Sequence, residues 1–376
     1  MTPRDAGPGN RPRTVVLHRV SVPLQRPLAT AHGVIAERDV VLVEWQRADG
    51  VVGWGECPTL SIPGYSDETT DVAWSALVDR LAPAALAERP TLGEPACPMA
   101  SGALRDAALD ASLRAAGRSL LDEVRHPELS PVAGHERAGG DSSRRELPMC
   151  RVVGLDAPAA AWELGPGEVL LKAKVSPGTV GRLREVRDAH PGLALAADAN
   201  GSFAGPEDVP PWLDDVGLVY LEQPFPATAL DAHAAWRATH ATPVALDESL
   251  RDLANLRRAI GSGALDVVSV KPARLGGVRA AVAALELAAA SGLDAFVGGM
   301  VELGVGRATA AAVGGHPAVT LPTDLGPSDR YVERDVVAPI VATAEGLLVP
   351  DGPGCGRTPD PERLAEVTTD RVELRA

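Results

Sequence analysis

The stretch Leu170-Leu171-Lys172-Ala173-Lys174-Val175 holds two of the three lysines in a chain with 36 lysines and arginines in total. The third, Lys271, ends a similar apolar run that begins at Val267. Lysine can shift its pKa when buried and act as a base, whereas arginine stays protonated in proteins. Codon bias toward arginine explains why lysine is scarce, but it does not explain where the three lysines stand.

Charged residues recur at a nearly constant interval after Lys174. Asp198, Glu222, Asp247 and Lys271 follow at spacings of 24, 24, 25 and 24 residues, and each ends a short apolar run. A strand, a loop, a helix and a return loop take a similar number of residues, so the pattern indicates repeated βα units. Charged groups at the carboxyl ends of parallel strands point to one mouth, where a (β/α) barrel has its active site.

Eight apolar runs fit this barrel, which matches the strand number of a (β/α)8-type barrel. The predicted strands cover residues 149–153, 169–175, 193–198, 217–222, 243–247, 266–271, 294–298 and 318–322. Helical segments rich in Ala, Leu and Arg are expected after the charged positions, and a Gly- and Ala-rich helix is expected at 303–315.

The first third of the chain has the pattern of a small sheet followed by helices. Strands are predicted at 14–22, 39–46 and 51–56, with a loop at 27–33 and a hairpin turn at 48–50, and helices near 68–87 and 98–124. We expect residues 1–12 to be a disordered tail, 13–125 an α+β domain, 126–146 a flexible linker or loop, 147–333 the barrel, and 334–376 a segment with a charged, helix-like end that packs on the α+β domain.

The composition argues against several classes of protein. The net charge of −14 disfavours nucleic acid or an anionic membrane as a main partner, and 3% aromatic residues leave little for base stacking. No apolar run has the length of a transmembrane helix, and the first residues lack the apolar core of a signal peptide. Four cysteines without CxxC pairing are typical of reduced thiols. We therefore expect a cytoplasmic protein, monomeric or homo-oligomeric, that acts on a small molecule.

Asp198, Glu222 and Asp247 come from consecutive predicted strands and offer only oxygen ligands. Mg²⁺ suits a hard site of this kind, with Mn²⁺ as the alternative, and it keeps positions open for substrate. Any one of the three would more often be an ordinary strand-end carboxylate, but their common register favours a shared site. Asn200 and Glu248 lie just beyond two of these carboxylates and are candidates to orient them.

Lys174 and Lys271 would reach this metal site from opposite sides. Mg²⁺ beside a bound carboxylate substrate would stabilise the enediolate that forms as the α-proton leaves. A nearby cation and desolvation would lower the pKa of a lysine toward neutrality, as a general base requires. Lys172 would add positive charge that lowers the pKa of Lys174 further. The alternative for Lys172 is an ion pair with a neighbouring carboxylate.

Five motifs occur in order: Lys-x-Lys, Asp-x-Asn, Glu-Gln-Pro, Asp-Glu-Ser and Lys-Pro. This set resembles the enolase superfamily, in its muconate-lactonising-enzyme subgroup, and the resemblance covers nearly the whole chain. It implies an α/β fold, a (β/α)7β modified TIM barrel with an α+β capping domain formed by the N-terminal region and the C-terminal tail. Residues 53–57 fit that capping domain, and Gly33 and residues 58–66 would close over the substrate.

Three further stretches resemble the o-succinylbenzoate synthase / N-succinylamino acid racemase family: residues 271–277, residues 298–302, and Asp324 with residues 328–331. The resemblance implies that the backbone around Gly298, Gly299 and Met300 helps to hold the succinyl carboxylate of the substrate, since N–H groups next to glycine are accessible. Ser328 is a further candidate for substrate binding. The alternative is a glycine-rich turn at a barrel mouth.

The resemblance implies dehydration of 2-succinyl-6-hydroxy-2,4-cyclohexadiene-1-carboxylate to o-succinylbenzoate, a step of menaquinone biosynthesis. Lys174 would remove the α-proton, and Lys271 would stabilise the intermediate from the other face. The alternative is racemisation of N-succinylamino acids, in which both lysines act as bases and Arg274 tunes the pKa of Lys271. A third hypothesis, a non-catalytic binding protein on this scaffold, is disfavoured by the complete set of metal ligands and bases.

Overall fold

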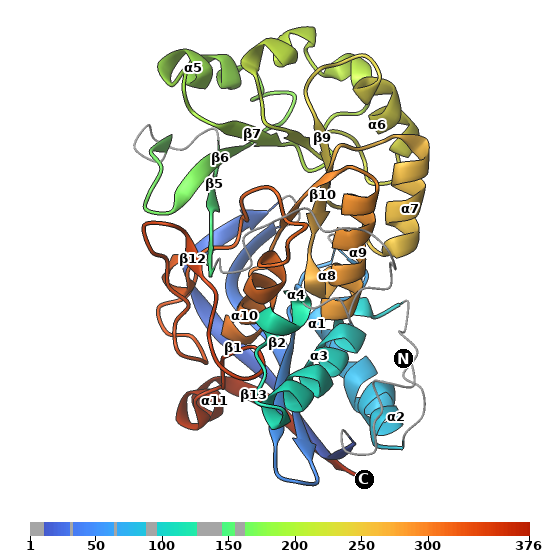
Figure 1. Ribbon diagram of the computed structural model, residues 1–376, viewed down its shortest axis with the longest axis vertical. Helices are drawn as coiled ribbons and strands as arrows, with labels where there is room; N and C mark the ends of the chain where they lie inside the picture. The colour runs from blue at the N-terminus through green and yellow to red at the C-terminus, as the bar shows by residue number, and fades with distance from the viewer. Residues whose placement is uncertain (1–10, 31–32, 64–65, 88–95, 126–144, 155–161) are drawn as a thin grey trace.

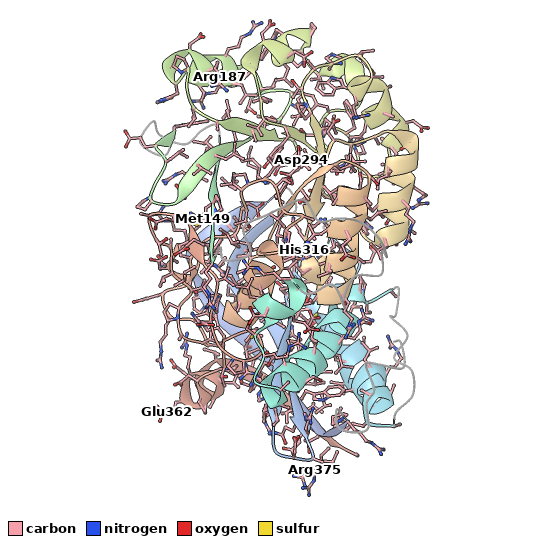
Figure 2. The ribbon with its side chains drawn as sticks, in the orientation of Figure 1. Met149, Arg187, Asp294, His316, Glu362 and Arg375 are labelled. Atoms are coloured by element: carbon pink, nitrogen blue, oxygen red, sulfur yellow. The ribbon has the colours of Figure 1, made fainter. Side chains whose placement is uncertain are left out.

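The computed structural model describes residues 11–30, 33–63, 66–87, 96–125, 145–154 and 162–376. These residues form two parts, an antiparallel sheet with its helices and a curled parallel sheet surrounded by helices (Figure 1). Arg187, on the outside of the second part, and Arg375, at the end of the first, lie at opposite ends of the molecule (Figure 2). Most of the predicted tail and of the predicted linker lies outside the described residues.

The antiparallel sheet has the strand order β13-β1-β2-β3. Its strands are β1 (Pro12–Thr30), β2 (Gly33–Arg47), β3 (Val52–Cys57) and β13 (Thr368–Arg375). Valine-rich runs favour these strands, and the predicted hairpin turn joins β2 to β3. Because β13 pairs with β1, we propose that the end of the chain belongs with this part.

The predicted loop at 27–33 is wrong for the described residues. β1 and β2 stay paired as far as Leu28 opposite Ile35 and Thr30 opposite Gly33. Backbone hydrogen bonds hold this outer section of the hairpin, and they do not require the alternation of apolar side chains from which a strand is predicted. The apolar pattern therefore stops before the strands do.

Two helical stretches belong to this part. The first joins α1 (Thr70–Ala76), the π-helical turn η1 (Leu77–Leu81) and α2 (Ala82–Leu86), and the second consists of α3 (Pro98–Ala115) and α4 (Leu120–Arg125). The helix predicted at 98–124 is thus interrupted, because Gly117 takes a left-handed φ of +65° after α3.

The second part contains seven parallel strands in the order β5 to β11. They are β5 (Met149–Gly154), β6 (Glu168–Lys174), β7 (Leu195–Asp198), β8 (Leu221–Glu222), β9 (Val244–Leu246), β10 (Val267–Val270) and β11 (Asp294–Val297). The surrounding helices are α5 (Arg182–Ala189), α6 (Leu230–Arg237), α7 (Leu253–Ser262), α8 (Pro272–Leu275), α9 (Val278–Ala290) and α10 (Gly304–Gly314). The predicted barrel with a capping domain is therefore confirmed.

Two expectations about the barrel are wrong in detail. Between β7 and β8 the chain forms only short 3₁₀ turns, η4 (Pro206–Asp208) and η5 (Pro211–Val216), because prolines interrupt an α-helix. The eighth run, 318–322, is not a regular strand. It closes the barrel through scattered hydrogen bonds, from Thr320 N to Ala295 O and, just past the run, between Thr323 and residues 148–150. The proline in this run cannot donate to a ladder.

The C-terminal residues connect the two parts. β4 (Glu146–Leu147) pairs with β12 (Leu347–Leu348), and the 3₁₀ turn η6 (Ser328–Arg330) precedes β12. The predicted charged helix is present as α11 (Pro361–Val367), but the last residues continue as β13 rather than as helix. None of the described helices has the length and apolar character to span a membrane.

One buried layer of side chains fills the barrel. Each strand, or the residue just before it, contributes one side chain that is at most 2% exposed: Cys150, Leu170, Ala196, Tyr220, Ala245, Val267 and Phe296. The rings of Tyr220 and Phe296 stack with centroids 5.5 Å apart. The polar residues of the next layer pack directly above this apolar layer.

Candidate active site

Side chains two residues beyond the apolar layer enter the same interior, because successive residues of a strand alternate between its two faces. The next layer therefore consists of five residues near the ends of β6 to β10: Lys172, Asp198, Glu222, Asp247 and Ser269. Each is at most 4% exposed. The three predicted metal ligands thus lie on neighbouring strands, with Asp198 directly opposite Glu222 in the sheet.

Every carboxylate of this layer is paired with a basic side chain. Lys174 Nζ lies 2.8 Å from Asp198 Oδ2, and Lys172 Nζ lies 2.7 Å from Glu222 Oε2. On the other side, Lys271 Nζ lies 2.9 Å from Asp247 Oδ2. All three lysines of the chain therefore converge on the three carboxylates that recur with them in the sequence.

The lysines differ in their access to solvent. The side chain of Lys174 is 47% exposed, that of Lys271 is 12% exposed and that of Lys172 only 2%. Lys174 ends β6 and Lys271 follows β10, so three strands separate them around the sheet. A substrate over the carboxylates would have Lys174 and Lys271 on two different sides and Lys172 beneath them.

Burial and charge act in opposite directions on the carboxylates. Burial, and then repulsion by Asp198 and Asp247, raise the pKa of Glu222 despite the nearby lysine. Burial would raise the pKa of Asp247 as well, but Arg274 and Lys271 outweigh burial and hold it well below its usual range. Of these two carboxylates, Glu222 is therefore the one whose ionised form burial disfavours, and an added cation beside it would favour that form.

Lys172 takes the ion-pair arrangement that was the alternative for it. Its Nζ donates to Glu222 and also to Asp324 Oδ2 at 3.0 Å. Burial disfavours its charged form, but the carboxylates of Asp324 and Glu222 raise the pKa of Lys172 well above its usual value. Lys172 also lies 5.1 Å from the centroid of the Phe296 ring, in the floor of the barrel.

Three residues predicted to assist the metal ligands or the bases, Asn200, Glu248 and Arg274, lie against this layer. Asn200 accepts from Lys174 Nζ at 2.7 Å and donates to Glu248 Oε1 at 3.0 Å, with a left-handed φ of +45°. Arg274 Nη1 donates to Asp247 Oδ1 at 2.5 Å, and its Nη2 donates to Ser269 O. Asn200 therefore steadies Lys174, and Arg274 shares Asp247 with Lys271.

Two residues of the site, Asp324 and Gln223, belong to quoted stretches of the sequence but were given no role there. Asp324, which the sequence marks through the resemblance of Asp324 and residues 328–331 to a known family, pairs with Lys172. Gln223 is fully buried with φ +40°, and its Oε1 accepts from Asp247 N at 3.0 Å and from Ser249 N at 3.2 Å. Gln223 thus fixes the backbone around Asp247, a role that the sequence pattern does not reveal.

The glycine segment after β11 lies beside Lys271, but its donors are engaged. A Cβ atom on Gly298 would lie 3.3 Å from Lys271 Cε. Gly298 N donates to Val270 O, Gly299 N to Asp324 Oδ1 and Met300 N to Glu302 Oε1. A substrate carboxylate held by this segment would therefore replace a protein carboxylate as the acceptor.

Ser328 takes part in a structural contact. It is 3% exposed, and its Oγ accepts from Ile340 N at 3.1 Å while its own N donates to Ile340 O at 2.8 Å. These bonds hold the turn η6 to the segment before β12.

The capping part is tied directly to the glycine segment. Arg38, 1% exposed, donates through Nε to Val301 O at 2.8 Å. Glu56 accepts from Leu303 N and Gly306 N, both at 2.7 Å, at the start of α10. Val301 has φ +57°, a conformation that is unfavourable for a β-branched residue and that these bonds help to maintain.

The three carboxylates of the layer have the chemistry of a divalent-cation site, but their side chains are not arranged around a common point for a cation. Among the described residues, no group of three or more His, Cys, Asp or Glu side chains is arranged so that it could hold a metal ion. Asp198, Glu222 and Asp247 are nevertheless buried on neighbouring strands, and they offer the oxygen ligands that Mg²⁺ prefers. Holding Mg²⁺ would require Lys174 and Lys271 to move away from their carboxylates.

Comparisons with known proteins match both parts. A family model described as the mandelate racemase / muconate lactonizing enzyme N-terminal domain matches residues 12–122, and one described as enolase C-terminal domain-like matches residues 161–363.

Individual relatives match along nearly their whole length. An N-succinylamino acid racemase from an Amycolatopsis species is 36% identical over 95% of this chain and 98% of its own. An o-succinylbenzoate synthase from Geobacillus stearothermophilus is 32% identical over 94% of this chain and 95% of its own. A solved structure of a probable mandelate racemase from Alicyclobacillus acidocaldarius is 35% identical, with a TM-score of 0.83 over 96% of this chain and 98% of that one.

Proposed function

This chain belongs to the enolase superfamily, in its muconate-lactonising-enzyme subgroup, and on that premise we propose that it is an o-succinylbenzoate synthase. The substrate would be 2-succinyl-6-hydroxy-2,4-cyclohexadiene-1-carboxylate, and the reaction would be a step of menaquinone biosynthesis. Relatives named o-succinylbenzoate synthase, at 30% to 32% identity, support the proposal. Superfamily membership itself supports an enzyme.

The observation that carries the proposal is the position of two lysines at the edges of a row of carboxylates. Lys174 and Lys271 lie within 2.9 Å of Asp198 and Asp247, on either side of Glu222. A base is needed on one side of a bound carboxylate substrate, and a cation on the other side stabilises the negative charge that develops.

In the proposed reaction, Lys174 acts as its neutral amine and removes the proton α to the ring carboxylate, which leaves the enediolate of the substrate. The same side chain, now an ammonium group, gives that proton to the departing hydroxyl on the same face, so that water leaves. The two electrons of the broken C–H bond complete the aromatic ring. Asn200, which contacts Lys174 Nζ, would hold the amine toward the substrate.

The remaining charged residues would stabilise this intermediate. Lys271 would face the developing negative charge from the opposite side, and Lys172 would hold Glu222 in place from below. Superfamily members generally use Mg²⁺, and we propose that Asp198, Glu222 and Asp247 would hold it. When bound, Mg²⁺ would lower the energy of the negative charge on the substrate carboxylate.

A second function, racemisation of N-succinylamino acids, is favoured by a specific observation. Lys271 is held to Asp247 at 2.9 Å, nearly the distance of Lys174 from Asp198, so each side has a candidate base. The racemase from Amycolatopsis also supports it. One site could carry both reactions, because both begin with loss of an α-proton.

The test is a paired assay of the purified protein with Mg²⁺. One sample receives the cyclohexadiene carboxylate and is followed by loss of its absorbance, and the other receives N-succinylamino acids and is followed by optical rotation. Fast dehydration with little racemisation is the expected result. Efficient racemisation would favour the second function, and no reaction in either sample, with no exchange of α-protons in deuterated water, would contradict the enzyme proposal.

A further inference from the structure

We propose that helix α3 of the capping part positions Lys271, so that the packing of α3 decides how well Lys271, relative to Lys174, exchanges the α-proton of a substrate. The inference rests on the proposed function, because it takes both lysines as bases. It assigns α3 the part of a positioning element, which acts through the turn that carries Lys271.

Residues 271–277 form a single compact turn. Leu275 N donates to Lys271 O at 3.1 Å, and Gly277 N donates to Pro272 O at 2.8 Å. The turn carries both Lys271 and Arg274 to opposite oxygens of Asp247. Any displacement of this turn would therefore move both of the cations that meet Asp247.

The backbone of α3 lies directly against the end of this turn. A Cβ atom added to Gly102 would lie 2.7 Å from Gly276 C and 2.9 Å from Gly277 N, a distance that real side chains do not adopt. Both glycines of the turn have left-handed φ values, +94° at Gly276 and +103° at Gly277. Figure 1 shows α3 next to α8, the helical portion of the turn.

Two side chains of α3 fasten the contact. Arg105 Nη2 donates to Gly276 O at 2.6 Å, and Asp106 Oδ1 accepts from Val278 N at 2.9 Å. Val278 is the first residue of α9, so Asp106 also lies at the positive end of a barrel helix. The capping part thus holds the turn in three ways: at the carbonyl of Gly276, at the N–H of Val278 just after the turn, and by packing of the α3 backbone against it.

Lys174 is held in a different way. It is part of β6, where it is paired in register with Asp198 of β7, and its side chain is 47% exposed. A change on α3 reaches Lys271 through one turn, but it can reach Lys174 only through the barrel sheet. The two lysines should therefore respond unequally to substitutions on α3.

The experiment measures α-proton exchange of each enantiomer of an N-succinylamino acid in deuterated water with Mg²⁺, by nuclear magnetic resonance. The Lys271→Ala variant identifies the enantiomer whose exchange depends on Lys271. Gly102→Ala is the test variant, because its methyl group must push the turn away from α3. Gly261→Ala is the matched control, a helical glycine where a Cβ atom meets no neighbour within 4 Å.

We expect Gly102→Ala to slow exchange of the Lys271-dependent enantiomer by about tenfold to a hundredfold, the cost of a misplacement near 1 Å, and to change the other by less than about twofold. Gly261→Ala should leave both rates unchanged. If Gly102→Ala does not fold, Asp106→Asn decides instead, since it preserves volume but weakens the bond to Val278, with a smaller loss in the same direction.

Equal losses for the two enantiomers, or no change in either, would overturn the inference and leave the proposed function standing. If the unmodified protein exchanges the α-proton of only one enantiomer, the inference would also be overturned. That result would favour a dehydratase in which only one lysine acts as a base. Exchange of neither enantiomer, together with no dehydration, would overturn the proposed function and this inference with it.

Discussion

Lys172 Nζ and Glu222 Oε2 lie 2.7 Å apart inside the barrel, and both side chains are at most 3% exposed. Removing one partner of an ion pair this deep is strongly destabilising, because the other charge is left buried and uncompensated. Lys172 also contacts Asp324, so its ammonium group offsets the buried carboxylate of Glu222 and the partly buried carboxylate of Asp324. Lys172 therefore opposes the effect of burial on Glu222, although burial still leaves the pKa of Glu222 above its usual value.

Replacing Lys172 with methionine should destabilise the fold by about 3–5 kcal/mol, because it leaves the buried Glu222 and the partly buried Asp324 without this cation. The free energy of unfolding in urea measures this. Arg334→Met is the control, since its ion pair with Glu366 is 61% and 56% exposed and should contribute at most about 1 kcal/mol. Similar small losses for both variants would show that Lys172 has no such structural role.

Glu56 should make stability depend on pH. Burial, and then repulsion by Glu302, raise the pKa of Glu56 from 4.5 to about 8, despite its bonds to Gly306 N and Leu303 N. A raised pKa means that the folded state holds a proton that the unfolded chain has lost, so this contribution to stability is present at acid pH and falls as pH rises from 4.5 to about 8.

The Glu56→Gln variant tests this. Urea unfolding across that pH range should show a smaller decline for the variant than for the unmodified protein. Glu366→Gln, at a side chain that is 56% exposed, is the control and should keep the original decline. An identical decline in all three proteins would contradict the assignment to Glu56.

If Asp198, Glu222 and Asp247 bind Mg²⁺, the melting temperature of the protein should rise when Mg²⁺ is added. Mg²⁺ at about 100 times its dissociation constant should stabilise the protein by about 2.7 kcal/mol, and a chelator should remove the gain. Asp198→Asn should lose most of this gain, whereas Asp266→Asn, a carboxylate paired with Arg237 outside the site, should keep it. No Mg²⁺ effect on the unmodified protein would contradict the proposed metal ligands.

The sequence could predict those parts of the site for which strand alternation alone determines which side chains face the barrel interior. Because Leu170, Lys172 and Lys174 are two residues apart on one strand, the sequence predicts that all face one interior, and the recurring interval predicts their neighbours on the next strands. The layer of Lys172, Asp198, Glu222 and Asp247 follows from these two periods without knowledge of any long-range contact.

Other features depend on contacts between distant parts of the chain. Gly102 and Gly276 touch across 174 residues, and Glu56 caps α10 from another part of the fold, so no local pattern reveals either contact. The contact of Asp324 with Lys172 could not be predicted, because the eighth segment closes the barrel through scattered hydrogen bonds rather than as a regular strand. Periodic patterns in the sequence predict helices and strands, whereas contacts between residues far apart in the sequence are seen only in the folded structure.

The central claim, that Lys174 is the base, is tested most directly by Mg²⁺-dependent dehydration of the cyclohexadiene carboxylate by the Lys174→Arg variant. Arginine keeps the positive charge but cannot give up its proton, so we expect turnover to fall by at least about a hundredfold while the Mg²⁺-induced rise in melting temperature survives. Turnover close to that of the unmodified protein would show that Lys174 is not the base.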